Sequence, residues 1–194
     1  RTRVDALQSM IASEFTGLLP RCEFLQTDAN AALLAWCKAR NWKKERAVVF
    51  LDPYGMQVEW RTVEALGNTK GIDLLYLFSL GVARMLTKDG NIDPSWQARL
   101  DTLFGTTDWR EHFYKTTTQH GLFGAMETTR RDATVKNILA YVEGRLGKTF
   151  AGVAPSLVLK NSKASPLFAL CFAAANEAGA PTAIRIAKSI LKET

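Results

Sequence analysis

Hydrophobic positions along the first half of the chain alternate between helical spacing and short continuous runs. A first amphipathic helix before Pro20 is predicted by apolar residues at helical spacing, namely Val4, Leu7, Ile11, Phe15 and Leu18. Residues 22–26 predict a short strand, and the largely apolar runs at 47–51 and 72–78 predict strands buried on both faces of a parallel sheet. Helical patterns around 33–37 and 58–66 separate these runs.

This order of elements predicts an α/β fold with a doubly wound, Rossmann-like sheet, because helix–strand alternation gives right-handed βαβ units. Adjacent parallel strands are expected at 47–51 and 72–78, both covered by helices. The regular hydrophobic pattern is absent from residues 81–132, which predicts an irregular, partly helical insertion. The rest of the chain predicts a helix at 135–146, an antiparallel hairpin and a last helix at 181–191. The hairpin strands are 156–159 and 166–172, and residues 1–194 are expected to form one domain.

The composition is that of a globular protein, with 47% hydrophobic and 23% charged residues, which argues against intrinsic disorder. Cys22, Cys37 and Cys171 are far apart and form no C-x-x-C pair, so we expect reduced core thiols in a cytoplasmic protein. The sequence contains no run of about eighteen apolar residues, so it predicts no transmembrane helix. The net charge of +6 favours polyanions such as nucleic acid, although no dedicated basic arm is present.

Two predicted strand ends carry candidate chemistry, because ligands of open α/β sheets bind beyond the carboxyl ends of the strands. Asp28 and Asn30 follow the first run, and Asp52-Pro53-Tyr54-Gly55 follows the second. An acid and a proline carbonyl can accept hydrogen bonds from a substrate amine. A tyrosine offers a stacking face for a base, and glycine permits a sharp turn. An ordinary strand-to-helix turn is the alternative interpretation, since Asp, Pro and Gly are common turn residues.

Beyond this turn the chain resembles the three-Cys-motif partner protein family. The resemblance covers nearly the whole chain and is carried by residues 50–60, 72–78, 84–86, 103–105, 108–109 and 166–173. It implies a bacterial methyltransferase-like Rossmann fold and an associated protein that bears a three-cysteine motif. The turn itself is similar to the Asp-Pro-Pro-Tyr motif of amino-methyltransferases and to the Asp-Pro-Phe-Gly turn of transfer-RNA guanine-amino methyltransferases.

These resemblances imply roles for individual residues in methyl transfer from S-adenosylmethionine to an exocyclic amino group of a nucleic-acid base. Asp52 would orient the amine, Pro53 would accept a hydrogen bond through its carbonyl, and Tyr54 would stack on the base. Asp28 matches the acid that contacts the cofactor adenine, with Asn30 beside it.

The sequence departs from the methyltransferase pattern on the cofactor side. No glycine-rich turn precedes Asp28, and Asp5, within the first helical pattern, is a poor substitute for the acid that holds the cofactor ribose. We therefore expect a partial domain without its first βαβ unit and with an incomplete S-adenosylmethionine pocket. Such a chain should bind the cofactor weakly or not at all.

Two other functions remain open. One is a non-catalytic binding module with a methyltransferase-like fold that acts with a three-Cys-motif partner. The other is a nucleic-acid-binding subunit, whose bases would stack on the aromatic residues at 96, 109, 113 and 114; core packing is the alternative for these rings. No metal site is expected, because His112 and His120 lack metal-ligand spacing.

Overall fold

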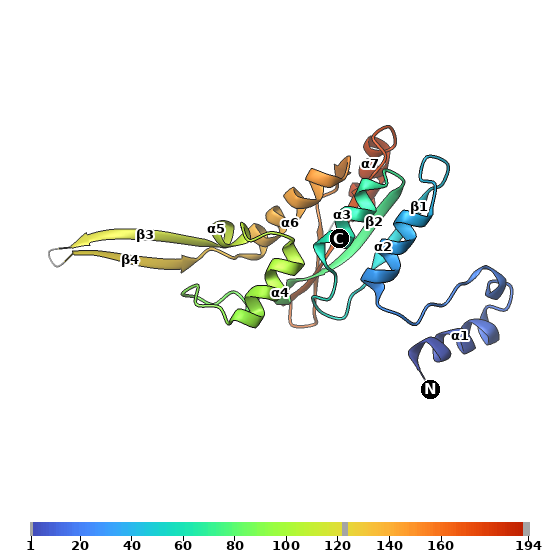
Figure 1. Cartoon of the computed structure of the whole chain (residues 1–194), viewed down its shortest axis with the longest axis horizontal. Coiled ribbons are helices and arrows are strands. Elements are labelled where there is room, and N and C mark those ends of the chain that lie inside the picture. The colour runs from blue at the N-terminus through green and yellow to red at the C-terminus, as the bar shows by residue number, and fades with distance from the viewer. Residues whose placement is uncertain (1, 122–123, 192–194) are drawn as a thin grey trace.

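The computed structural model describes residues 2–121 and 124–191, which form a mixed α/β structure around one sheet (Figure 1). The strands of this sheet are β1 (Ala47–Leu51), β2 (Ile72–Ser79), β5 (Gly152–Val153), β6 (Leu157–Lys160) and β7 (Pro166–Ala174). The helices are α1 (Arg3–Glu14), α2 (Ala29–Ala39), α3 (Trp60–Asn68), α4 (Pro94–Phe104), α5 (Trp109–Phe113), α6 (Val135–Thr149) and α7 (Ala180–Ile190). No helix in the described ranges is both long and apolar enough to cross a membrane.

The sheet is mixed, with strand order β1-β2-β7-β5, and β6 also pairs with β7. β1 and β2 are adjacent and parallel, in register from Ala47 opposite Ile72 to Leu51 opposite Tyr76, and α3 connects them. This confirms the predicted βαβ pairing. β2 and β7 are antiparallel, and so are β6 and β7, which confirms the predicted C-terminal hairpin.

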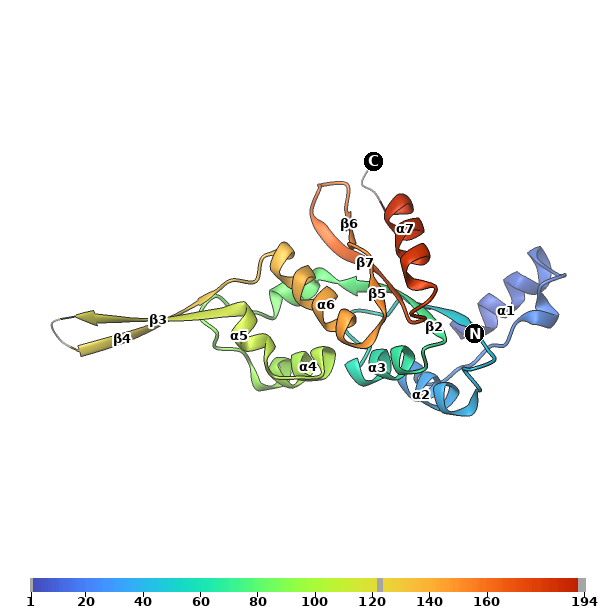
Figure 2. The same cartoon turned by 90° about the horizontal axis from the view of Figure 1, so that it is seen from above.

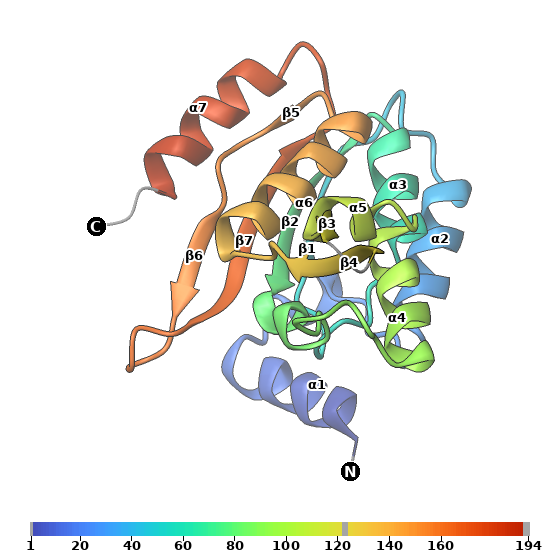
Figure 3. The same ribbon diagram turned by 90° about the vertical axis from the view of Figure 1, so that its left-hand side faces the viewer.

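Helices cover the two faces of the sheet unequally (Figure 3). α2, α3 and α6 lie on one side of the sheet, whereas α7 lies on the other and packs against β7. The side chains of β2 are therefore buried to different degrees on the two faces. Those on one face are almost fully buried (Ile72, Leu74, Tyr76 and Phe78), and those on the other face are only half-buried. The main core therefore lies on the side of α3 and α6.

The prediction that β1 is covered on both faces is wrong. Val48 and Phe50 are 64% and 58% exposed, whereas Val49 and Leu51 are buried. In the described part of the chain β1 pairs only with β2, and α7 packs mainly on β7. The outer face of β1 consequently has little packed over it, despite its apolar sequence.

The strand predicted at 22–26 is also absent. These residues form an extended segment between a 3-10 turn, η1 (Leu19–Arg21), and α2. An apolar run becomes a strand only where a neighbouring strand completes its hydrogen bonds, and none of the described strands lies beside this one. Leu25 is 62% exposed and Cys22 is exposed, so Cys22 is not the core thiol that was expected.

α1 lies apart from the sheet, at the end of this extended segment (Figure 1). Thr2 and Asp5 form a reciprocal capping box at its first turn, which explains where it begins. None of its residues is buried, and its apolar side chains Leu7 and Met10 are more than 40% exposed.

The expected insertion contains helices but also a regular element that the sequence pattern missed. After η2 (Leu80–Arg84), α4 and α5 come β3 (Tyr114–Gly121) and β4 (Gly124–Arg131), which pair as an antiparallel ribbon. Figures 1 and 2 show this ribbon projecting away from the sheet. It has no hydrophobic face to reveal it, because its paired positions include Thr116 with Thr129 and Thr117 with Thr128.

Candidate functional site

The Asp52-Pro53-Tyr54-Gly55 turn follows β1 directly at the carboxyl end of the parallel pair β1–β2. Gly55 has a φ of 72°, a left-handed conformation that glycine adopts without strain. This backbone conformation therefore explains why a glycine occupies position 55. Asp52 and Tyr54 are exposed, and Pro53 is half-buried.

Asn30 fixes the chain between this turn and α3. Its side-chain nitrogen donates to the Gln57 carbonyl oxygen at 3.0 Å, and its Oδ1 accepts from the Glu59 backbone N–H at 3.0 Å and from the Thr62 hydroxyl at 2.9 Å. Asn30 and Thr62 are the buried polar residues of the described core. These contacts give Asn30 a structural role, and its assignment to cofactor binding stays a prediction.

Asp28 occupies the N-cap of α2, where its Oδ1 accepts from the Ala31 backbone N–H at 2.8 Å. This side-chain contact explains where the helix begins. Asp28 also lines a cavity of about 560 Å³ together with Asn30, Asp52 and Pro53. The fold thus brings both predicted strand-end groups to one cavity, although they are more than twenty residues apart in sequence.

Asp52 contrasts with Asp28 in what its side chain does. Its carboxylate makes no hydrogen bond or ion pair with any residue that the structure describes. An Asp retained only to shape a turn would accept a backbone N–H close by in sequence, as Asp28 does. Asn30 holds the segment that follows the turn, at Gln57 and Glu59, and the Asp52 carboxylate, which has no described partner, is available to a ligand.

Tyr54 is the most exposed large hydrophobic side chain of the described residues, at 79%. Its hydroxyl makes no hydrogen bond within the described ranges, and its ring contacts the Arg3 guanidinium, 5.7 Å from the ring centroid. The ring therefore contributes little to the core. Its face is open to a stacking partner on the side that Arg3 leaves free.

A second groove, of about 470 Å³, adjoins the turn and was not expected from the sequence. It is lined by Tyr54, Met56, Gln57, Met85, Ser95, Trp96 and Arg99. Trp96 and Arg99 are three positions apart in α4 and so share one face of the helix. The spacing of three residues from Trp96 is the sequence signal that could have identified Arg99 as a candidate site residue.

The aromatic residues grouped by the sequence separate into two sets. Trp109 and Phe113 are fully buried, and Tyr114 is half-buried with its hydroxyl donating to the Thr87 carbonyl oxygen at 2.9 Å. Core packing is therefore the role of these three residues. Trp96 is 44% exposed and is the member that faces the groove beside the turn.

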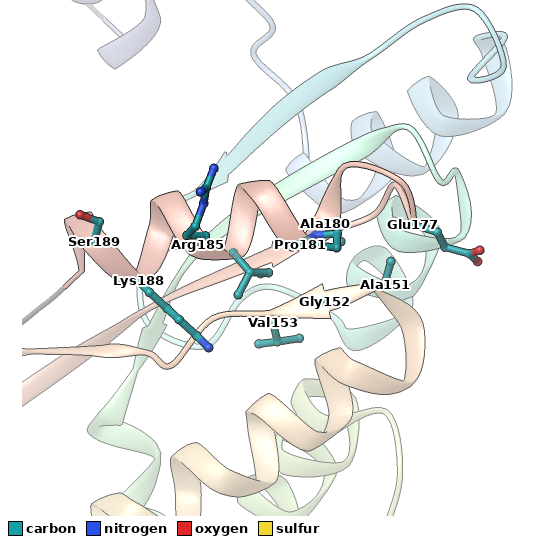
Figure 4. Close-up of a pocket in the computed structure, with 10 residues that line it drawn as sticks. Ala151, Gly152, Val153, Glu177, Ala180, Pro181, Arg185, Lys188 and Ser189 are labelled. Atoms are coloured by element: carbon teal, nitrogen blue, oxygen red, sulfur yellow. The ribbon is translucent and has the colours of Figure 1, made fainter.

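A larger hollow lies elsewhere, between β5 and α7, with a volume of about 1080 Å³ (Figure 4). Arg185 and Lys188 line it, but Figure 4 shows them pointing in different directions, with Glu177 pointing away from both. A ligand site needs polar groups that converge on one position. The smaller cavities at the β1 turn meet this condition better.

Histidine and cysteine side chains provide no metal cluster within the described residues. His112 instead packs against the Tyr141 ring at 4.8 Å between centroids, and the His120 side chain lies outside the described residues. Cys171 is buried in β7, where burial raises the pKa of its thiol to about 12. This thiol is consequently a poor nucleophile.

No family model, curated protein or solved structure matches this chain, so the comparisons do not bear on its resemblance to three-Cys-motif partner proteins.

Proposed function

We propose that the protein transfers a methyl group from S-adenosylmethionine to an exocyclic amino group of a nucleic-acid base, with the β1 turn as its substrate site. One observation carries the proposal. The Asp52 carboxylate and the exposed Tyr54 ring lie together at the carboxyl end of a parallel strand, and neither side chain forms a hydrogen bond within the described structure. Groups left free in this way fit ligand contact better than turn stabilisation.

The residues of the turn would act mainly by positioning. The Asp52 carboxylate and the Pro53 carbonyl accept the two N–H groups of the amine, which aims the nitrogen lone pair at the methyl donor. Tyr54 holds the base by stacking. The nitrogen lone pair would attack the methyl carbon as its bond to the cofactor sulfur breaks and S-adenosylhomocysteine leaves. No strong base would be required, because the methylated ammonium would lose its proton only afterwards, to the Asp52 carboxylate or to water.

The cofactor would occupy the cavity that Asp28 shares with Asp52 and Pro53. The Asp28 oxygen that does not cap α2 is free to accept from the cofactor adenine. This chain has no glycine-rich turn to approach the rest of the cofactor, so we expect it to bind S-adenosylmethionine weakly. Calorimetry tests this expectation, and tight binding by the 194-residue chain would place the cofactor pocket elsewhere.

Methyl transfer is best tested with the protein as its gene encodes it, with labelled S-adenosylmethionine and mixed cellular nucleic acid. We expect Asp52→Ala to abolish transfer while cofactor affinity stays nearly unchanged, because its contact is made mainly in the transition state. Tyr54→Phe should keep activity and Tyr54→Ala should lose it. Full activity in a well-folded Asp52→Ala protein would exclude this turn as the site.

A non-catalytic binding module is the second candidate, and the uncovered face of β1 favours it. Val48 and Phe50 expose apolar surface that a partner could cover, such as a three-Cys-motif protein. A module of this kind needs no carboxylate at position 52. Partner binding that survives Asp52→Ala but is lost in Phe50→Lys, without any detectable methyl transfer by the wild-type protein, would favour this candidate.

A further inference from the structure

The groove between the β1 turn and α4 combines exposed rings with a cation. Tyr54 and Trp96 are 79% and 44% exposed and both line it, and the Arg99 side chain, exposed on the same face of α4, makes no ion pair with a described residue. Large aromatic side chains are usually buried, since each can bury 150–250 Å². Two rings exposed to this extent, beside a cation without a described ion-pair partner, indicate a surface suited to a ligand.

The groove lining also selects the kind of ligand. None of its seven lining residues is acidic, and Met56 and Met85 add thioether side chains, which pack well against flat rings. Asp93, the N-cap of α4, already has partners, because it accepts from the Ser95 backbone N–H at 2.8 Å and from the Ser95 hydroxyl at 2.5 Å. The lining therefore favours a flat, anionic ligand.

We propose that this groove binds single-stranded nucleic acid, with Tyr54 and Trp96 stacking on bases and Arg99 contacting a phosphate. A groove of about 470 Å³ is large enough for a nucleobase. The strand must be single because the faces of a base are covered by its neighbours within a duplex. The net charge of +6 adds long-range attraction for any such strand.

This proposal rests on the proposed function, since Tyr54 belongs to both sites, and it adds residues that the turn alone does not supply. Stacking at Tyr54 alone would leave a flexible strand free to rotate about that base. Trp96 and Arg99, held on α4, would fix the flanking nucleotide and its phosphate. The structure thus assigns α4 to substrate alignment beside the Asp52 carboxylate.

Fluorescence anisotropy of the 194-residue chain with labelled oligonucleotides of about twelve nucleotides tests the proposal without any cofactor. Single-stranded RNA and DNA form two arms, and a duplex of the same sequence forms a third. We expect a single strand to bind more tightly than the duplex. Trp96→Ala should weaken binding by about 5- to 150-fold, the range of one base stack, and Trp96→Phe should restore most of it.

Salt titration isolates the phosphate contact. Arg99→Gln should lower the slope of log affinity against log salt by about 0.7, the value for one phosphate of a single strand. Arg185→Gln removes another exposed cation, from α7, and should leave this slope unchanged. Equal binding of duplex and single strand, no binding at all, or full affinity in a folded Trp96→Ala protein would overturn the proposal. Trp96-dependent binding without methyl transfer would instead remove only the proposed enzymatic function.

Discussion

Two aromatic regions share α4 and differ in what their side chains do. At the end of the helix, Phe104 is fully buried and its ring lies 5.2 to 6.5 Å from the rings of Tyr141, Phe113, Phe78 and Trp109. At the start, Trp96 is partly exposed and faces the groove beside Tyr54. No ring contact joins Trp96 or Tyr54 to another described aromatic side chain.

This contrast separates residues that hold the fold from residues that are free to bind. The buried rings support each other through edge and tilted contacts, which add to the free energy of burial. The exposed rings leave apolar surface in contact with water, which is unfavourable, and they make no comparable packing contacts. A function in ligand binding explains why such rings are present, and it predicts opposite responses to substitution in the two regions.

Phe104→Ala should produce the largest loss of stability. Removing a fully buried phenylalanine at the centre of the ring cluster should lower the free energy of unfolding by about 3–5 kcal/mol. Trp96→Ala, on the same helix, should lower it by less than about 1 kcal/mol. Urea denaturation of both variants measures the difference. Similar losses in the two variants would show that Trp96 belongs to the core.

Asn30→Ala should rank second. It leaves the Glu59 backbone N–H and the Thr62 hydroxyl without their acceptor in a buried setting, so we expect a loss of about 2–4 kcal/mol in the free energy of unfolding. Adding Thr62→Val should recover about 1 kcal/mol, because the hydroxyl that lost its partner is then gone. Strictly additive losses in the double variant would contradict the contact.

The Asp108–Tyr141 pair should give a smaller, pH-dependent effect. The Tyr141 hydroxyl donates to the Asp108 carboxylate and, as the main cause, holds the pKa of this carboxyl below its usual value. A lowered folded-state pKa stabilises the protein above the unfolded value near pH 4, and the stabilisation is lost as the pH falls through the folded value.

Asp108→Asn should therefore lower the free energy of unfolding at pH 7 by about 1–2 kcal/mol, and the difference from wild type should shrink below about pH 4. Tyr141→Phe removes the donor and should give the same pH profile. Unfolding by urea at a series of pH values between 7 and 3 measures both variants. A difference that does not change with pH would show that the pair does not couple stability to protonation.

The sequence predicted the elements that carry a regular hydrophobic period and missed those that do not. The parallel pair β1–β2 and the hairpin β6–β7 have apolar runs of strand length, and both were found where expected. The ribbon β3–β4 has threonine in place of a hydrophobic face, so the β-branched composition is its only sequence signal for strands, and the ribbon was not predicted. The strand predicted at 22–26 is absent for a different reason, because no described strand lies beside this segment to pair with it.

The positions of the candidate residues were predictable only in part. The rule that ligands bind at the carboxyl ends of strands applies to Asp52, which follows β1, whereas Asp28 follows no strand and lines the same cavity as the N-cap of α2. That rule says nothing of tertiary hydrogen bonds, so it could not show that Asn30 holds the segment between the turn and α3. The rule also could not predict that Trp96 and Tyr54 line one groove, because their proximity depends on how α4 packs.

The smallest effect on stability, and the sharpest test of the site, comes from two aspartates that line the same cavity. Asp28 caps α2, so Asp28→Ala should lower the free energy of unfolding by about 1 kcal/mol. The Asp52 carboxylate has no hydrogen-bonding partner among the described residues, so Asp52→Ala should change stability by less than about 0.5 kcal/mol. Chemical denaturation of the two variants side by side measures this difference, and Asp28 serves as the matched control because both are exposed acids at strand or helix ends. If Asp52→Ala loses as much stability as Asp28→Ala, the carboxylate has a structural partner and the turn is an ordinary one. If only Asp28→Ala is destabilised, the Asp52 side chain does not contribute to the fold, as expected of a residue that binds substrate.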